Sequence, residues 1–268
     1  MILITGGTSY NVSDFLKNTN EEICIVLNKT KPQIIRENIV YFKHIKEFKK
    51  SKERKKVNII INFASSYNSS NSFFSLFNSS FYFLYRLIKI INNKNLKIII
   101  NIGSYFQDLD SKNYTNYVLV KNFTSYFYIK IQKKVKYINL KLGDTFGEND
   151  NRNKIFKYLK DNQKNNEIVF SGNELDIFYP LSVTDITKCI NYIIRNTNLF
   201  ISSNISNVRL YGEPLSLLSL AEQYEKDLNL KFIKKFKSSK VRRPPAKDNN
   251  TDFAFIVNKE TFKLIKYI

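Results

Sequence analysis

Histidine, cysteine and tryptophan are nearly or wholly missing from this sequence. Its 268 residues contain no tryptophan, one methionine, one histidine and two cysteines. A single histidine, His44, cannot build a histidine-based metal cluster, and two separated cysteines, Cys24 and Cys189, make no zinc site. A Ser-His-Asp mechanism would have to use His44, which lies in a basic stretch and which we interpret as a surface residue. We therefore predict no metal site.

The two cysteines fall in a predicted strand and a predicted helix, as buried free thiols of a reducing compartment do, so we predict a cytoplasmic protein. The sequence also lacks a long apolar run. Gly6 and Gly7 interrupt the first apolar stretch, which argues against a signal peptide. Residues 73–91 include Arg86 and Lys89, so we predict a buried or subunit-contact helix there and no membrane span.

Acidic residues are scarce, with 23 against 43 lysines and arginines, which gives a net charge of +20 at pH 7. The lysines are spread along the chain, with denser runs at residues 43–56, 130–136 and 231–243. No nucleic-acid motif accompanies these runs, and a charge run is usually a solvated face. We predict no specific nucleic-acid partner, while the positive field would attract an anionic ligand.

Short apolar runs alternate with helical stretches along the first half of the chain. The runs lie at residues 1–5, 22–27, 39–43, 57–63, 96–102 and 135–142, and the helical stretches at 12–18, 43–52, 70–93 and 114–133. This alternation predicts an α/β fold, a Rossmann-like doubly wound parallel sheet with helices on both faces.

Beyond residue 147 the alternation gives way to helices. They are predicted at 151–163, 183–196 and 215–228, with a short strand at 168–170. We predict a Rossmann-like core over residues 1–147 and a small substrate-side portion over 148–268, some elements of which return to the core.

The first predicted strand ends in a glycine turn at residues 5–8, Thr-Gly-Gly-Thr, and a helical stretch follows. Strand, glycine turn and helix start together place a phosphate on backbone N–H groups. Two glycines after a strand are weak evidence alone, so the residues downstream decide how much weight they carry.

Ser104 ends a later apolar strand, and Tyr117 and Lys121 follow it on one predicted helix. Residues at i and i+4 share a helix face, so the phenol and the ammonium project into the same space. A nearby cation favours phenolate and brings the tyrosine pKa from about 10 towards neutral pH, where the side chain can transfer protons. The spacing is common by chance on exposed helix faces, and its place in the chain makes it informative.

In this order the motifs resemble those of the extended short-chain dehydrogenases/reductases, the family of nucleotide-sugar epimerases, dehydratases and ketoreductases. The resemblance covers nearly the whole chain, with landmarks at residues 4–8, 60–65, 78, 100–104, 117–121, 140–147, 182–186 and 207–212. Within that family, residues 58–62, 102–107 and 140–150 resemble most the CDP-3,6-dideoxyhexulose 4-reductases, such as CDP-paratose and CDP-abequose synthases.

The resemblance implies a ketoreductase of surface-polysaccharide (O-antigen) sugar biosynthesis, in which NADPH reduces the C4 ketone of a nucleotide-linked, CDP-type deoxyhexulose. Tyr117 would protonate the developing alkoxide, Lys121 would lower the tyrosine pKa and hold the nicotinamide ribose, and Ser104 would hydrogen-bond the oxygen. The cofactor-binding residues would be Gly6, Gly7, Thr8, Ser9, Tyr10, Asn28, Lys29, Phe63, Ala64, Ser65, Lys121 and Thr145. The substrate-binding residues would be Ser66, Tyr105 and Asp144.

The glycine turn departs from the family pattern, Gly-x-x-Gly-x-x-Gly. Ser9 and Val12 occupy the second and third glycine positions. Serine is small, but valine is bulkier, so we expect the following helix to lie further out. The cofactor then sits differently, binds weakly or is lost.

Basic residues follow the second predicted strand, where an acidic residue would accept the ribose hydroxyls of NAD. Lys29 and Lys31 lie there, and no carboxylate occurs between Asn28 and Arg36. This pattern favours NADP(H), with NAD(H) still possible, and a solvated basic loop is the competing interpretation.

Two other functions remain open. The same fold could carry out epimerisation or dehydration with tightly held NAD. A dehydratase of this family typically has an Asp-Glu pair just after the catalytic Ser or Thr, and residues 105–107, Tyr-Phe-Gln, offer none. A non-catalytic scaffold would explain the lost glycines but not the intact Ser-Tyr-Lys set.

The helices predicted over 70–93 and 114–133 carry more aromatic side chains than one face of a sheet needs. Subunits of the family commonly pair through these helices, so we predict a homodimer with a four-helix contact. The aromatic residues concerned are Phe73, Phe77, Tyr85, Phe123, Tyr126 and Tyr128.

Overall fold

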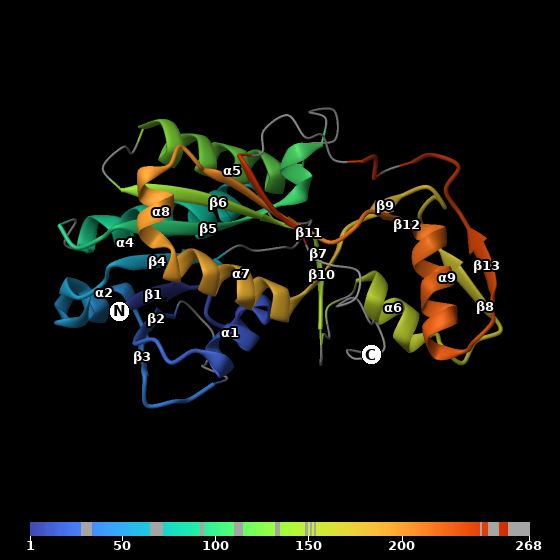
Figure 1. Cartoon of the computed structure of the whole chain (residues 1–268), viewed down its shortest axis with the longest axis horizontal. Coiled ribbons are helices and arrows are strands. Elements are labelled where there is room, and N and C mark those ends of the chain that lie inside the picture. The colour runs from blue at the N-terminus through green and yellow to red at the C-terminus, as the bar shows by residue number, and fades with distance from the viewer. Residues whose placement is uncertain are drawn as a thin grey trace.

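A computed structural model gives the fold of the chain (Figure 1). It describes residues 1–27, 34–64, 72–91, 94–109, 115–131, 135–147, 150, 152, 154–241, 243–245 and 252–256.

A single eight-stranded sheet forms the centre of the described structure, in the order β14-β11-β6-β5-β4-β1-β2-β3, and all its neighbouring strands are parallel. Most of these strands are apolar and buried because helices cover both faces, as a parallel sheet requires. The predicted Rossmann-like fold class is confirmed. The strands are β1 (Ile2–Thr5), β2 (Ile23–Val26), β3 (Ile39–Phe42), β4 (Ile59–Asn62), β5 (Ile98–Ser104), β6 (Lys136–Leu142), β11 (Asn207–Tyr211) and β14 (Phe253–Ile256).

Helices pack on both faces of the sheet and define two apolar cores (Figure 1). One face is covered by α1 and α7 and the other by α2, α4 and α5, with π-helical turns after α3 and after α5. The helices are α1 (Ser13–Asn18), α2 (Ile45–Lys50), α3 (Phe73–Phe77), η3 (Asn78–Tyr82), α4 (Phe83–Ile90), α5 (Asn116–Tyr126), η6 (Phe127–Ile131), α7 (Val183–Arg195) and α8 (Thr197–Ser202).

A smaller lobe lies at one end of the molecule, at the right of Figure 1, and has its own apolar core. Phe156, Leu159, Phe170, Leu220 and Tyr224 are buried in it. Among the described residues, three strand pairs lie outside the main sheet: β10 with β7, β12 with β9, and β13 with β8. The elements are β7 (Asp144–Phe146), α6 (Ile155–Asp161), β8 (Glu167–Phe170), β9 (Ile177–Phe178), β10 (Pro180–Ser182), β12 (Leu215–Ser216), α9 (Leu217–Leu228) and β13 (Ile233–Phe236).

A row of polar side chains crosses five neighbouring strands of the main sheet. Thr5 Oγ1 donates to Asn62 Oδ1, and each asparagine amide then donates to the next. Asn62 Nδ2 lies 2.7 Å from Asn101 Oδ1, Asn101 Nδ2 lies 3.3 Å from Asn139 Oδ1, and Asn139 Nδ2 lies 3.4 Å from Asn207 Oδ1. All five residues are paired in register on β1, β4, β5, β6 and β11. The buried amides are satisfied by one another.

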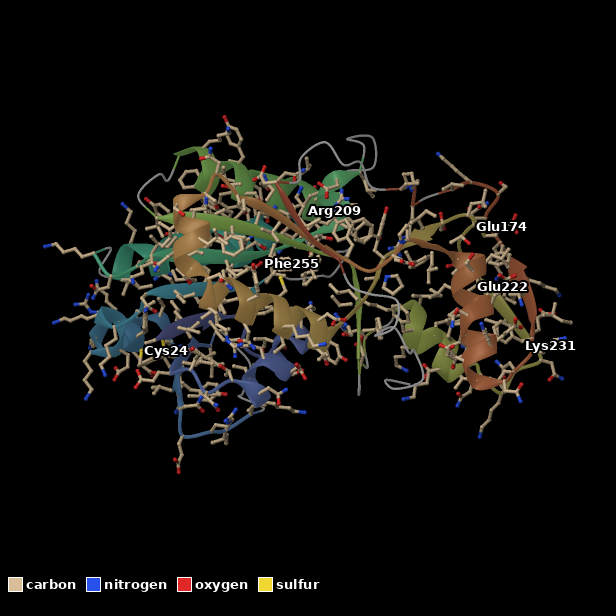
Figure 2. All side chains as sticks on the ribbon, in the orientation of Figure 1. Cys24, Glu174, Arg209, Glu222, Lys231 and Phe255 are labelled. Carbon is tan, nitrogen blue, oxygen red and sulfur yellow. The ribbon has the colours of Figure 1, made fainter. Side chains whose placement is uncertain are left out.

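Both cysteines are free and buried, one under each face of the sheet. Burial raises the pKa of the Cys24 thiol to about 12 and raises that of Cys189 as well, so both thiols stay protonated. Figure 2 shows Cys24 at the opposite end of the molecule from Glu174, Glu222 and Lys231, which belong to the smaller lobe. Within the described ranges, no helix is both long enough and apolar enough to cross a bilayer.

Candidate active site

The strand order reverses direction between β1 and β4, because β2 continues the chain on one side of β1 and β5 lies beyond β4. In open parallel sheets, ligands bind in the crevice at the carboxyl ends of such strands. Gly6 follows β1 with a φ of +67°, and a Cβ at this position would lie 2.6 Å from Ala64 N. Only glycine allows the ends of β1 and β4 to approach this closely.

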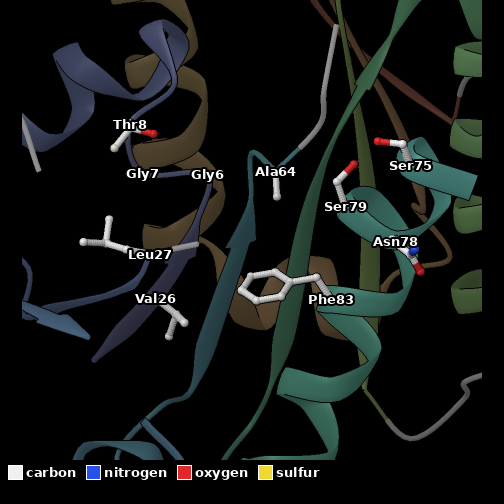
Figure 3. A pocket seen from close by; sticks show the side chains of 10 residues that line it. All are labelled: Gly6, Gly7, Thr8, Val26, Leu27, Ala64, Ser75, Asn78, Ser79 and Phe83. Carbon is white, nitrogen blue, oxygen red and sulfur yellow. The ribbon is translucent and has the colours of Figure 1, made fainter. Parts of the chain in front are cut away.

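A cavity of about 490 Å³ opens at this crevice (Figure 3). Its size lies within the range of small-molecule and cofactor sites. In Figure 3 the glycine turn lies on one side, Ala64 in the middle and the α3–η3 segment on the other, with Phe83 pointing between them. The cavity is lined by Gly6, Gly7, Thr8, Val26, Leu27, Ala64, Ser75, Asn78, Ser79 and Phe83.

These lining residues fit a dinucleotide. The glycine turn leaves room for a pyrophosphate against the backbone, and Val26, Leu27 and Phe83 supply an apolar surface for a flat ring. Four of the predicted cofactor residues line the cavity: Gly6, Gly7, Thr8 and Ala64. Phe63 is buried beside them in the core.

The two departures from the glycine pattern have different surroundings. Ser9 closes the turn, since its N–H donates to the Gly6 carbonyl at 2.8 Å. Val12 is fully buried in the core under α7, at the end of a 3-10 turn (Tyr10–Val12), and α1 begins only at Ser13. The valine side chain is therefore accommodated by the core, and a 3-10 turn separates the glycine turn from the α-helix.

The segment predicted to select the cofactor is only partly described. Asn28, Lys29 and Lys31, and likewise Ser65 and Ser66, lie outside the described residues. Arg36 is described, and its guanidinium donates to the carbonyls of Leu16 and Lys17 at 3.0 and 2.6 Å. Arg36 therefore stabilises the end of α1, where cations favour the helix dipole.

Ser104 is the last residue of β5 and caps the 3-10 helix η4 (Tyr105–Asp108). Its Oγ accepts from the Phe106 N–H at 3.4 Å, and its own N–H donates to Gln107 Oε1 at 3.0 Å. A hydroxyl that accepts in this way keeps its proton for donation to another oxygen.

Lys121 and Tyr117 lie on α5, which packs against β5. The Lys121 side chain is only 3% exposed, and its Nζ donates to the Ile102 carbonyl on β5. Nζ also lies 5.6 Å from the centroid of the half-buried Tyr117 ring. Burial lowers the pKa of Lys121 to about 8. The structure thus brings the ammonium to the phenol at the strand that ends in Ser104.

The predicted substrate residues Tyr105 and Asp144 meet through Arg243, which the sequence analysis did not assign. Arg243 Nη2 lies 2.7 Å from both Asp144 oxygens and donates to the Tyr105 hydroxyl. Its guanidinium lies 3.7 Å from the Phe178 ring centroid. Burial raises the pKa of Asp144 to about 7, while the Tyr179 N–H and Lys154 act to lower it.

Two cationic side chains, Arg152 and Lys154, lie beside the glycine turn. Arg152 Nη1 and Lys154 Nζ donate to the Thr145 hydroxyl at 3.0 and 3.2 Å. Arg152 also lies 4.3 Å from the Tyr10 ring centroid and donates to Asn11 Oδ1. Burial and the nearby Arg152 guanidinium lower the pKa of Lys154 to about 8. Asp150 compensates one of the two positive charges, since its Oδ2 lies 2.5 Å from Arg152 Nη2.

The acid nearest to Ser104 in sequence is already paired. Asp108 is buried, accepts from the Lys141 ammonium and accepts from the Tyr211 hydroxyl at 2.6 Å. Among the described residues, no group of three or more His, Cys, Asp or Glu side chains could hold a metal ion.

The parallel sheet and its switch-point cavity define a Rossmann-like α/β protein. No model of a known protein family matches the sequence, and none of the curated proteins does. Solved structures do match. A UDP-glucuronic acid 4-epimerase from Bacillus cereus, in complex with UDP-glucuronic acid and NAD, is 13% identical and has a TM-score of 0.68 over 100% of this chain and 93% of that one.

Two further structures give the same picture. A UDP-N-acetylglucosamine 4-epimerase from Methanobrevibacter ruminantium M1, in complex with UDP-N-acetylmuramic acid, is 14% identical, with a TM-score of 0.65 over 98% and 91% of the two chains. An NAD-dependent NDP-hexosamine 5,6-dehydratase involved in tunicamycin biosynthesis is 13% identical, with a TM-score of 0.67 over 92% and 88%. At these identities the likeness establishes the shared fold.

Proposed function

We propose that this chain is a nicotinamide-dependent enzyme acting on nucleotide-linked sugars, with Ser104, Tyr117 and Lys121 as its catalytic residues. The observation that carries the proposal is the buried Lys121 ammonium. It is held by a carbonyl of the strand that ends in Ser104 and lies 5.6 Å from the Tyr117 ring centroid. Burying a cation costs free energy, so a buried lysine is unusual in a fold that does not need it. Residues with shifted pKa values are concentrated at functional sites.

A bound nicotinamide dinucleotide supplies or accepts a hydride. At the same carbon, Tyr117 takes the proton of the sugar hydroxyl when the sugar is oxidised, or gives a proton to the ketone oxygen when it is reduced. Lys121 favours the phenolate form, and Ser104 donates to the sugar oxygen. The glycine turn and Ala64, which line the cavity, would hold the dinucleotide phosphates and ribose. Arg152 and Lys154 lie between this turn and the substrate side, where they would attract a diphosphate.

The finer function we propose is reduction of the C4 ketone of a CDP-linked deoxyhexulose, with NADPH as the donor and a cytoplasmic location. It is supported by the resemblance at residues 58–62, 102–107 and 140–150 and by the lysines that follow β2. Asp108 is the acidic residue nearest to Ser104 in sequence, and its carboxylate is buried and bonded to Lys141 and Tyr211. A carboxylate held in this way does not serve as the acid or base of a dehydratase, which favours a reductase.

A second candidate is a sugar-nucleotide 4-epimerase with tightly held NAD. It is favoured by the names of two structural neighbours, both 4-epimerases, one of them in complex with NAD. The two reactions use the same three catalytic residues and differ in whether the cofactor is regenerated.

We also propose that the chain forms a homodimer through α3, η3 and α5. Phe74 is 76% exposed and Tyr126 is 63% exposed, and Phe73, Tyr82 and Phe123 are exposed on the same elements. An aromatic surface of this kind is unusual on a monomer, and a four-helix contact would bury it.

The test is incubation with NADPH or NADH and a panel of nucleotide-linked 4-ketosugars, and with NAD⁺ and a panel of nucleotide-linked sugars. A reductase oxidises one cofactor molecule for each sugar reduced, and mass spectrometry shows a product two hydrogens heavier. An epimerase changes the sugar stereochemistry with no net loss of reduced cofactor. Absence of both nicotinamide binding and turnover would leave the non-catalytic scaffold as the better explanation.

A further inference from the structure

We propose that Gln107 is a positioning residue that fixes Ser104 on β5 relative to Lys121 and Tyr117 on α5. The proposal rests on the catalytic assignment above. Gln107 lies on η4, three residues after Ser104, and its side chain is buried. It was not predicted as a site residue, although residues 104–107, Ser-Tyr-Phe-Gln, have the pattern of a capping box, in which the glutamine side chain accepts from the serine N–H.

The Gln107 amide uses both its acceptor and its donor. Oε1 accepts from the Ser104 N–H at 3.0 Å. Nε2 donates to Asn122 Oδ1 at 3.0 Å and to Ser125 Oγ at 3.5 Å, and both partners lie on α5. One side chain therefore bonds the end of the serine strand and the helix of the tyrosine and lysine.

These contacts close a ring of hydrogen bonds. Ser125 Oγ donates to the Lys121 carbonyl at 3.0 Å, and Lys121 Nζ donates to the Ile102 carbonyl, two residues before Ser104. The ring runs from β5 through Gln107 to α5 and returns to β5 through Lys121. A strand and a helix joined at two points in this way cannot slide past one another without breaking a buried hydrogen bond.

Gly103 makes room for this arrangement. A Cβ at position 103 would lie 2.5 Å from Gln107 Oε1 and 2.7 Å from Asn139 Oδ1. A side chain there would push the Gln107 amide away from the strand. The absence of a side chain at Gly103 therefore allows Gln107 Oε1 to accept from the Ser104 N–H.

The expected role is in turnover rather than in binding. Ser104 stabilises charge on the substrate oxygen only if its hydroxyl is held at the right distance from the phenol of Tyr117, and a misplacement of about 1 Å can cost about 100-fold in rate. Gln107 is not among the residues that line the cavity at the glycine turn. Its loss should therefore leave the cofactor dissociation constant unchanged.

The experiment is a double-mutant cycle between Gln107→Met and Ser104→Ala. Methionine keeps the volume but loses all three hydrogen bonds, so we expect kcat to fall about 10- to 100-fold with KM nearly unchanged. In the Ser104→Ala background the same change should cost less than about 3-fold, because the hydroxyl that Gln107 positions is gone. Multiplicative losses would overturn the proposal.

Two further variants keep the test sharp. Gln107→Glu retains an acceptor for the Ser104 N–H but loses the donor to Asn122 and Ser125, so it should recover only part of the lost kcat. Asn122→Ala removes the helix partner and should likewise cost part of the methionine loss. A glutamate variant no faster than the methionine variant counts against the proposal. Gln223→Met, at a partly buried glutamine of the smaller lobe that donates to Asp227, is the matched control and should leave kcat unchanged.

Amide hydrogen exchange at Ser104 separates this proposal from the proposed function. Gln107→Met should accelerate exchange of the Ser104 N–H, and Gln107→Glu should not. A wild-type protein without turnover or nicotinamide binding would overturn the proposed function. Unchanged exchange in Gln107→Met would overturn the positioning role, whatever the activity of the wild type.

Discussion

Arg243 and Asp144 are 99 residues apart in sequence, and a single guanidinium nitrogen lies 2.7 Å from both carboxylate oxygens. The two side chains are largely buried, with 19% and 13% of their surfaces exposed. The segment that follows β13 is thus tied to the strand that continues from β6. Asp144, which was predicted to contact substrate, instead accepts from Arg243, and the same guanidinium nitrogen donates to the Tyr105 hydroxyl.

Removal of this guanidinium should destabilise the fold. Arg243→Met leaves the Asp144 carboxyl buried without its partner, and breaking a buried pair from one side costs about 3 kcal/mol. Asp144→Asn in the same chain should restore most of the loss. Urea unfolding of wild type, Arg243→Met and the double variant measures this, with Arg86→Met, at an exposed arginine of α4, as the control. Equal stability of Arg243→Met and wild type would contradict the prediction.

Tyr117→Phe should abolish proton transfer without disturbing the fold. The ring that Lys121 faces is retained, so cofactor binding and thermal stability should survive. Turnover should fall by roughly two to four orders of magnitude, the usual reach of a positioned acid or base. Tyr126→Phe, nine residues further along the same helix and exposed, is the control. Wild-type turnover in Tyr117→Phe would refute the mechanism.

Lys121 should make stability depend on pH. Its pKa is about 8 in the folded protein against an ordinary 10.5, so between these values the unfolded chain holds a proton that the folded chain has released. The stability of wild type should therefore rise relative to that of Lys121→Met as pH increases through this window, by on the order of 3 kcal/mol. Denaturant unfolding of both proteins across the window would show the difference, and parallel curves would refute it.

Cofactor choice can be tested at Lys29 and Lys31. If these lysines bind the extra phosphate, wild type should prefer NADPH, and charge reversal at either position should weaken NADPH binding while leaving NADH binding unchanged. Fluorescence titration with both cofactors measures the preference. Lys43→Glu, at an exposed lysine after β3, controls for the change in net charge. Equal or tighter binding of NADH by wild type would contradict the prediction.

The proposed dimer predicts a monomer when its aromatic surface is charged. Phe74→Glu and Tyr126→Glu should each shift the mass measured by light scattering to that of a single chain, because burying a carboxylate in an apolar contact is costly. Leu175→Glu, at a 59% exposed leucine of the smaller lobe, should leave the mass unchanged. A monomeric wild type at micromolar concentration would refute the dimer.

The sheet was predictable because its strands are short, apolar and separated by helices. Each of the first six strands lies within two residues of its predicted bounds, and α7 runs over 183–195 against a prediction of 183–196. β13 was missed, because its four residues, Ile-Lys-Lys-Phe, lie inside a basic run that we interpreted as a solvated face. α8 was also missed, since it continues directly from α7.

The site was predictable only where the chain is locally regular. The turn at Gly6 and the spacing of Tyr117 and Lys121 are short-range patterns, and the structure places them at the switch point and on α5. Arg243, Arg152 and Gln107 act through partners distant in sequence or on another element. Nothing in their local sequence marks those contacts, so they required the folded arrangement.

The asparagine row from Thr5 to Asn207 has a consequence for how the sheet assembles. If one of its strands were to pair one residue out of step, its amide would turn to the opposite, apolar face, and both neighbouring amides would be left without partners. Each buried amide left unpaired costs about 1–3 kcal/mol, which approaches the whole stability of many domains after a few such errors. The row therefore penalises misaligned intermediates, and apolar isoleucine strands that could otherwise pair in several ways are directed to one alignment.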